Sequence, residues 1–218
     1  SPFLWDDINL VKNNPDVTSW KTAKKALREN LGYGVVQQKS SSYRPFQSIT
    51  YIMDHEIWGK NVFGFHLTNV TFHTLAALAA FWLILVLFND YFLALFTAMI
   101  YAVHPIHTEA VAYISGRADP MSSAFILAAL VCYIKYHKKP NIIFLILSGL
   151  LFIGGLGSRE NSIILPLLAL LYNYVFKKKI RFEALGVLVG LGLLYITGRI
   201  TETIGAIGES QTLGTTVM

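Results

Sequence analysis

The stretch that decides the fold of this chain runs from Phe63 to Phe88 and reads FGFHLTNVTFHTLAALAAFWLILVLF. It contains no Asp, Glu, Lys or Arg. A helix needs about 20 mostly apolar residues to cross roughly 30 Å of membrane hydrocarbon, and this stretch is long enough. We therefore predict that it is a membrane-spanning α-helix and that the chain is an integral membrane protein.

Further apolar stretches follow this one. A tight Asn89-Asp90 turn leads into a second predicted helix that ends near Val103, and later helices are expected at 120–136, 141–157, 162–176 and 182–199. The predicted fold class is all-α, a polytopic transmembrane bundle of about six spans over residues 61–200. We expect residues 201–218 to start an outer loop, and a longer protein to continue on both sides.

The composition agrees with a membrane protein. The chain is 54% hydrophobic and 14% charged, with a mean hydropathy of +0.49, whereas soluble domains carry about 25% charged residues. The net charge of +5 does not indicate a nucleic-acid partner, because the Lys and Arg residues lie at helix ends, where membrane topology accounts for them. The single cysteine, Cys132, excludes an intrachain disulfide.

Residues 1–60 are the polar part of the chain. Apolar residues recur at helical spacing from Trp20 to Leu31, opposite several Lys and Arg residues. This pattern suits a helix lying on the membrane surface or an ordinary solvated helix. A second amphipathic stretch begins at Tyr43-Arg44-Pro45 and ends near Trp58. We expect residues 1–60 to form an extracytoplasmic first loop with interfacial helices.

Two short loops carry dense positive charge, His137–Lys139 and Lys177–Arg181. Counting the predicted spans places both loops on one side of the membrane, and the positive-inside rule makes that side cytoplasmic. The opposite side then receives residues 1–60, the loop 104–119, the turn 158–160 and the tail after residue 199.

The outer side collects acids, imidazoles and guanidinium groups, a mixture typical of an active site. These residues are Asp6, Asp7, Arg44, His104, His107, Glu109, Arg117, Asp119, Arg159 and Glu160. A carboxylate can remove the proton of an attacking hydroxyl, and arginines bind phosphate in a bidentate fork. Paired interfacial charges, a hydrogen-bonded loop or, for 104–109, a metal triad are the alternatives that these residues leave open.

Six motifs carry a resemblance to a known family. They are Trp5-Asp6-Asp7, Asn13-Asn14-Pro15-Asp16-Val17, Tyr43-Arg44-Pro45, Phe65-His66-Leu67-Thr68-Asn69, His104-Pro105-Ile106-His107-Thr108-Glu109-Ala110-Val111-Ala112 and Ser115-Gly116-Arg117-Ala118-Asp119. In this order they resemble the transmembrane and TPR-repeat-containing O-mannosyltransferases and their prokaryotic relatives, over residues 3 to about 176. Ser158-Arg159-Glu160 resembles that family's Ser-Lys-Glu turn, with Arg in place of Lys.

The resemblance implies the GT-C fold and an enzyme that transfers a sugar, such as mannose, with inversion. The donor would be a polyprenyl- or dolichyl-phosphate sugar, and the acceptor a protein or another molecule. The family's catalytic Asp lies in the first outer loop, where Asp7 and Asp6 fall. The expected donor-phosphate ligands are Arg44, Arg117 and Arg159, beside His104 and His107. Glu109, Asp119 and Glu160 would orient these cations. Similar enzymes that use single-phosphate donors generally require no metal, so neither a metal nor another cofactor is expected.

The same resemblance places the protein in the plasma membrane of a prokaryote or in the endoplasmic reticulum, with membrane lipid as a partner. A second function class is a non-catalytic GT-C-like subunit that binds lipid or scaffolds a larger complex. A transporter is a third class. The spans argue against it because, apart from His66 and His73, they lack ionisable groups at mid-depth.

Overall fold

The protein is described by a computed structural model that covers residues 7–22 and 44–215. Every regular element in these ranges is a helix, which confirms the predicted all-α class. The chain divides into two compact units, Ser1–Leu165 and Pro166–Met218. We refer to them as the first and second unit and describe each by itself.

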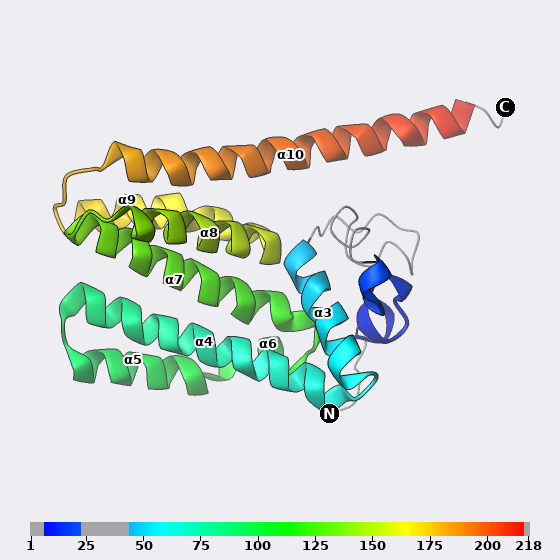
Figure 1. The fold of residues 1–218 in the computed structure, drawn as a ribbon, viewed down its shortest axis with the longest axis horizontal. Helices are drawn as coiled ribbons and strands as arrows, with labels where there is room; N and C mark the ends of the chain where they lie inside the picture. The colour runs from blue at the N-terminus through cyan, green and yellow to red at the C-terminus, as the bar shows by residue number, and fades with distance from the viewer. Residues whose placement is uncertain (1–6, 23–43, 216–218) are drawn as a thin grey trace. The chain divides into compact units, whose positions relative to one another are not determined.

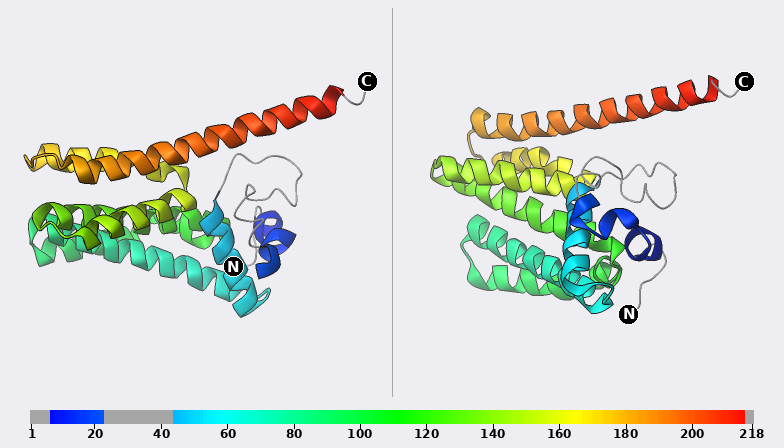
Figure 2. Two further views of the ribbon diagram at one scale, coloured as in Figure 1. Left: turned by 45° about the horizontal axis from the view of Figure 1, so that its top comes forward. Right: turned by 45° about the vertical axis from the view of Figure 1, so that its right-hand side comes forward.

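Four long helices form the body of the first unit. They are α4 (Val62–Phe88), α5 (Tyr91–Val103), α7 (Ala118–Lys138) and α8 (Ile142–Ser158). Helix α4 packs against α5 and α7, and α7 packs against α8 (Figure 1). Helix α3 (Pro45–Trp58) crosses one end of this bundle, and the further views show the same arrangement (Figure 2).

Shorter helical turns connect these elements. They are η1 (Ile8–Lys12), η2 (Pro15–Val17), η3 (Trp20–Thr22), η4 (Pro105–His107), α6 (Thr108–Ala112), η5 (Ser115–Arg117) and η6 (Glu160–Ile164). Most of them lie at the end of the bundle that α3 crosses, so this end carries most of the irregular backbone of the first unit (Figure 1).

The turn predicted at Asn89-Asp90 is confirmed. Asn89 ends α4 in the left-handed region with φ 55°, which Asn tolerates better than most residues. The Asp90 carboxylate accepts a hydrogen bond of 3.0 Å from the Leu93 amide and so caps α5. Two residues are therefore enough to reverse the chain between two apolar helices.

Three helical segments in the described part of the chain are long and apolar enough to cross a membrane, by length and composition: Val62–Phe88, Ser115–Lys138 and Phe182–Thr201. A bent pair, Tyr91–Val103 with Pro105–Ala112, would make a fourth. The six apolar stretches predicted from the sequence are all helical, but fewer of them than predicted pass this test. Proline at position 105 interrupts one because it lacks the amide hydrogen that a continuous helix needs.

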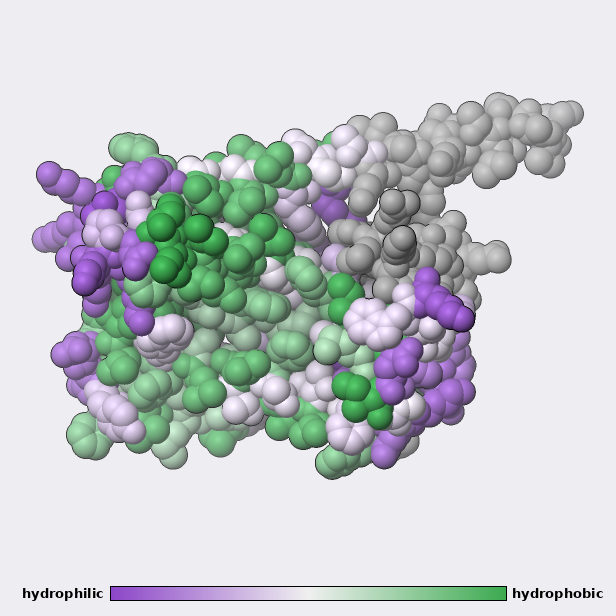
Figure 3. Space-filling model, in the orientation of Figure 1, coloured by the Kyte–Doolittle hydropathy of each residue, from purple (hydrophilic) through white to green (hydrophobic). Residues whose placement is uncertain are grey.

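Apolar side chains cover the outside of the first unit's helices. Phe92, Leu78 and Leu150 are exposed, although a soluble protein would normally bury such residues. Figure 3 shows the apolar residues over the middle of the bundle and hydrophilic residues gathered at its two ends. Exposed apolar side chains gathered in this way mark a lipid-facing surface.

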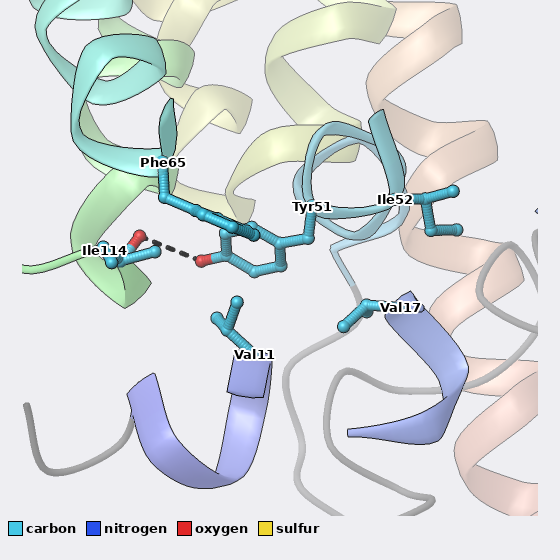
Figure 4. Packing of buried hydrophobic residues seen from close by; sticks show 6 residues of the cluster. All are labelled: Val11, Val17, Tyr51, Ile52, Phe65 and Ile114. Carbon is cyan, nitrogen blue, oxygen red and sulfur yellow. Dashed lines mark hydrogen bonds between the residues drawn. The ribbon is translucent and has the colours of Figure 1, made fainter. Parts of the chain in front are cut away.

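The first loop packs on the bundle through a small apolar cluster. Its buried members are Val11, Val17, Tyr51, Ile52, Phe65 and Ile114, shown in Figure 4. These residues come from two short helical turns, from α3 and α4, and from the segment before η5. The cluster therefore joins residues 8–17 to α3 and to the end of the bundle.

The amphipathic stretch predicted from Tyr43 to Trp58 is confirmed as α3, which begins with Pro45 at a position where proline suits a helix start. Of the other amphipathic stretch, Trp20–Thr22 forms a short helical turn, and positions 23–31 lie outside the described residues.

The second unit contains α9 (Leu165–Val175) and α10 (Phe182–Thr215). Helix α10 is longer than predicted, because the sequence suggested an end near Arg199. No proline occurs between Phe182 and Thr215, so nothing in the backbone chemistry forces the helix to stop at the polar residues.

Candidate functional site

The segment between α6 and η5 is fastened to α4 by one buried amide. Asn69 is fully buried, and its Nδ2 donates to the carbonyl oxygens of Val111 at 3.3 Å and Tyr113 at 2.7 Å. Two peptide carbonyls that would otherwise lack partners in the interior are thereby satisfied. Asn69 thereby joins α4 to the segment before η5, as buried polar side chains of membrane helices often join neighbouring elements.

Helix α3 holds the same segment from the other side. The Tyr51 hydroxyl donates to the Ile114 carbonyl at 3.0 Å (Figure 4), and Gln47 Nε2 donates to the Ser115 carbonyl at 2.8 Å. Burial raises the pKa of Tyr51 to about 12, so its hydroxyl keeps the proton that it donates. The position of residues 111–115 is thus set by buried hydrogen bonds from two helices.

Arg117 lies at the centre of this region and is fully buried. Its Nη2 pairs with Asp54 Oδ2 at 2.5 Å, and its guanidinium carbon lies 4.7 Å from the centre of the Tyr51 ring. Its nitrogens also donate to Asn69 Oδ1 (2.7 Å), Thr50 Oγ1 (3.1 Å) and the Phe65 carbonyl (2.9 Å). Arg117, predicted as a donor-phosphate ligand, is thus fully buried and has protein groups as its partners.

Asp7 is also fully buried, against the same segment. Its Oδ1 accepts a hydrogen bond of 2.7 Å from the Ser115 amide, and its Oδ2 accepts one of 3.4 Å from the Ile114 amide. The carboxylate therefore joins the start of the first loop to two backbone amides that are more than 100 residues away in sequence. Asp6, the other acid predicted as the base, lies outside the described residues.

Two arginines and two acids form ion pairs near the starts of α3 and α7 and the end of α8. We call this group the arginine cluster. Its members are Arg44, Asp119, Arg159 and Glu160. Arg159 forms an ion pair with Asp119, and Arg44 Nη2 lies 3.8 Å from Glu160 Oε2. Burial lowers the pKa of Arg159, the charge of Arg44 lowers it further, and Glu160 opposes the shift.

The arginine cluster is partly open to solvent. The exposed side-chain fractions are 20% for Arg44 and 29% for Arg159, which leaves surface for a ligand. Arg44 Nε is buried and makes no hydrogen bond with any residue that the structure describes. Asp119 and Glu160, predicted to orient the cations, each pair with an arginine. Glu109, by contrast, is exposed on α6 and has no ion pair with a described residue.

The predicted histidines His104 and His107 lie elsewhere. They line a cavity of about 400 Å³ bordered by α4, α5, η4 and α6, which we call the histidine pocket. His66 and His73 of α4 line it as well, and none of the predicted arginines does. The structure therefore divides the predicted site residues between the arginine cluster and the histidine pocket. Within the described ranges, no three His, Cys, Asp or Glu side chains are placed to hold a metal ion.

Sequence reasoning missed Asp54, the buried partner of Arg117. The available signal was its spacing, because Gln47, Tyr51 and Asp54 follow one another at four and three residues and so share a face of α3. All three are buried. A carboxylate on the face of a helix that also carries a tyrosine and a glutamine indicates a buried polar network, but its partner cannot be identified from one sequence.

Comparison with known proteins identifies the family of the described site. Residues 42–159, more than half of the chain, match the family described as dolichyl-phosphate-mannose-protein mannosyltransferase. This range contains α3 to α8, all the residues of the histidine pocket and every member of the arginine cluster except Glu160. No solved structure matches the chain.

Curated relatives agree with this match. A protein O-mannosyl-transferase of Caenorhabditis elegans is 32% identical over 150 residues, which are 66% of this chain and 22% of that protein. The human protein O-mannosyl-transferase TMTC2 is 35% identical over 137 residues, 62% of this chain and 16% of that protein. For the human protein O-mannosyl-transferase TMTC1 the values are 37% over 135 residues, 60% and 15%. The chain thus spans less than a quarter of the length of each of these relatives.

Proposed function

Because this chain belongs to the dolichyl-phosphate-mannose-protein mannosyltransferase family, we propose that its protein is a membrane glycosyltransferase that moves mannose from a lipid phosphate to a protein hydroxyl. The observation that carries the proposal is the arginine cluster. It contains two partly exposed guanidinium groups, and Arg159 directly follows α8, whose Leu150 and Ile153 side chains are exposed. Such a place suits a phosphate whose prenyl chain remains in the lipid.

The proposed reaction is a single displacement with inversion. The acceptor oxygen attacks the anomeric carbon of mannose, a carboxylate takes the hydroxyl proton, and the lipid phosphate leaves with the electron pair of the broken bond. A general base of this kind contributes about 10²–10⁴-fold to the rate. Asp6 or Asp7 is the proposed base. The burial of Asp7 against Ser115 supports a division in which Asp6 takes the proton and Asp7 positions the first loop.

Arg44 and Arg159 are the proposed ligands of the leaving phosphate. An anion bound by both guanidinium groups would offset the positive charge of Arg44, which lowers the pKa of Arg159. Developing charge on the phosphate would strengthen these contacts in the transition state. Asp119 and Glu160 hold the two cations in place.

The proposal also includes the location. The chain is an integral membrane protein of the family above, and the lysine-rich ends at residues 137–139 and 177–181 favour a cytoplasmic side opposite the arginine cluster. The active face is then extracytoplasmic in a prokaryote or lumenal in the endoplasmic reticulum. Membrane lipid, a lipid-linked mannose and a protein acceptor are the proposed partners.

The test is transfer of radiolabelled mannose from dolichyl-phosphate mannose to an acceptor protein by the full-length protein. We expect Asp6→Asn to lower kcat by about 10²–10⁴-fold while donor binding is retained. Arg159→Met should instead raise the donor KM, with Arg181→Met as a matched control, because Arg181 lies 3.7 Å from Glu183 on the second unit. Full activity with both Asp6 and Asp7 replaced would reject catalysis by this site and favour a lipid-binding subunit.

A further inference from the structure

One peptide group of the first unit is held at both of its ends. Its carbonyl belongs to Ile114 and accepts a hydrogen bond of 3.0 Å from the Tyr51 hydroxyl (Figure 4). Its amide belongs to Ser115 and donates a hydrogen bond of 2.7 Å to Asp7 Oδ1. Hydrogen bonds at the two ends of one peptide group polarise and strengthen each other. The contact of Asp7 is therefore linked to the hydroxyl of Tyr51.

Gln47 keeps the Tyr51 hydroxyl pointing toward this peptide group. Its Nε2 donates to the hydroxyl oxygen at 2.7 Å, so the single hydrogen of the hydroxyl remains for the Ile114 carbonyl. The same nitrogen donates to the Ser115 carbonyl at 2.8 Å. Tyr51 and Gln47 are both fully buried. Helix α3 therefore holds two successive peptide groups from the protein interior.

The peptide group held by Tyr51 is joined directly to the arginine cluster. Ser115 begins η5, which continues into α7, and Asp119 lies four residues later. Four residues of helix rise by only about 6–8 Å. Asp119 pairs with Arg159, a proposed ligand of the leaving phosphate. The contact of Asp7 and the contact of Arg159 therefore lie on one short helical stretch.

The other arginine of the cluster lies on the same helix as Tyr51. Arg44 directly precedes the first turn of α3, and Tyr51 follows about two turns later. The Tyr51 ring also packs on the guanidinium group of Arg117, whose carbon lies 4.7 Å from the ring centre. Tyr51 thus contacts residues 114–117 at two points and fixes this stretch against the helix that carries Arg44.

We propose that Tyr51 is a positioning residue, which sets the place of the first-loop acids relative to the donor cations. It acts through the Ile114–Ser115 peptide group on Asp7, the sequence neighbour of the proposed base Asp6. The inference rests on the transfer reaction proposed above. A displacement with inversion needs the base and the leaving-group ligands on opposite sides of one carbon atom. Because a misplacement of about 1 Å can lower a rate by about 10²-fold, their separation must be fixed.

The test compares Tyr51→Phe with the wild type in the full-length protein. The variant keeps the ring against Arg117 and loses only the hydroxyl. We expect kcat per donor-binding site to fall by about 10-fold to 100-fold, while the Kd of dolichyl-phosphate mannose changes by less than about twofold. Counting donor-binding sites leaves unfolded molecules out, so a loss of stability alone does not change this kcat. Gln47→Met removes the donor that orients the hydroxyl and should lower kcat by a smaller factor.

Tyr133→Phe is the matched control. Tyr133 is also fully buried, but it lies in the second half of α7, away from η5. The control variant loses the same hydroxyl group and should keep the wild-type kcat per donor-binding site. An equal fall of kcat in both variants, or an unchanged kcat in Tyr51→Phe, would overturn the proposal.

Amide hydrogen exchange gives a readout that needs no activity. In Tyr51→Phe the Ile114 and Ser115 amides should exchange about tenfold faster than in the wild type, because their acceptor Asp7 is held less firmly. Unchanged exchange would contradict the proposal even if kcat were lower. If the wild type transferred no mannose but the variant showed the faster exchange, the proposed function would fall, and the positioning of Asp7 by Tyr51 would stand.

Discussion

At the scale of single residues, Arg117 is the largest side chain that the described part of the chain buries completely. A buried guanidinium is tolerated only when its charge and its hydrogen bonds are met, and Asp54 supplies the charge. Asp54 is held in turn by the Thr68 hydroxyl, which donates to its Oδ1 at 2.7 Å. Arg117 therefore determines how α3, α4 and the start of α7 fit together.

Replacing Arg117 with Met should lower the free energy of unfolding by about 3–5 kcal/mol, because Asp54 would remain buried without a counter-charge. The measurement is reversible unfolding of the detergent-solubilised protein, followed by circular dichroism. The double variant Arg117→Met and Asp54→Leu should be markedly more stable than the single one. If the single variant lost less than about 1 kcal/mol, the ion pair would not be the support described here.

At the scale of elements, the packing of α3 on α8 depends on a glycine. A Cβ atom placed on Gly157 would lie 2.3 Å from the nearest ring carbon of Phe46, far inside van der Waals contact. Gly157 and Phe46 lie close in sequence to Glu160 and Arg44, so this contact sets the distance between two members of the arginine cluster.

Gly157→Ala should therefore destabilise the protein by about 1–3 kcal/mol through overpacking. It should also weaken donor binding, because α3 must move away from α8 and take Arg44 with it. Gly186→Ala is the control, since a Cβ there meets no atom within 4 Å. Melting temperature and donor KM are the two readouts, and an unchanged KM in a destabilised Gly157→Ala variant would show that Arg44 is not a donor ligand.

The elements themselves were largely predictable from the sequence. Hydropathy located all the apolar helices, and turn chemistry located the reversal at Asn89-Asp90, because both depend on residues that are neighbours in the chain. The contacts that each side chain makes with residues far away in sequence were not predictable. Whether Arg117 turns to Asp54 or to a ligand, and whether the histidines join the arginines, depends on contacts between residues far apart in sequence.

At the scale of the whole molecule, the membrane topology follows from the distribution of positive charge. Cysteines introduced at Lys138 and Ala110 should be labelled by a membrane-impermeant maleimide from opposite sides of the membrane. The background is Cys132→Ala, although Cys132 is buried and should react slowly. Labelling of both positions from one side would refute the proposed placement of the arginine cluster on the extracytoplasmic face.

The burial of Arg117 against Asp54 also has a consequence for how the protein is made. The ribosome synthesises α3 before α7. At about 5–20 residues per second, several seconds pass between the synthesis of Asp54 and that of Arg117. During that interval Asp54 must stay hydrated or take up a proton, since an unpaired buried carboxylate is strongly disfavoured. Helix α3 can complete its docking only when the start of α7 arrives. The packing of α3 on this end of the nascent bundle is therefore completed only after α4 and the start of α7 have been synthesised.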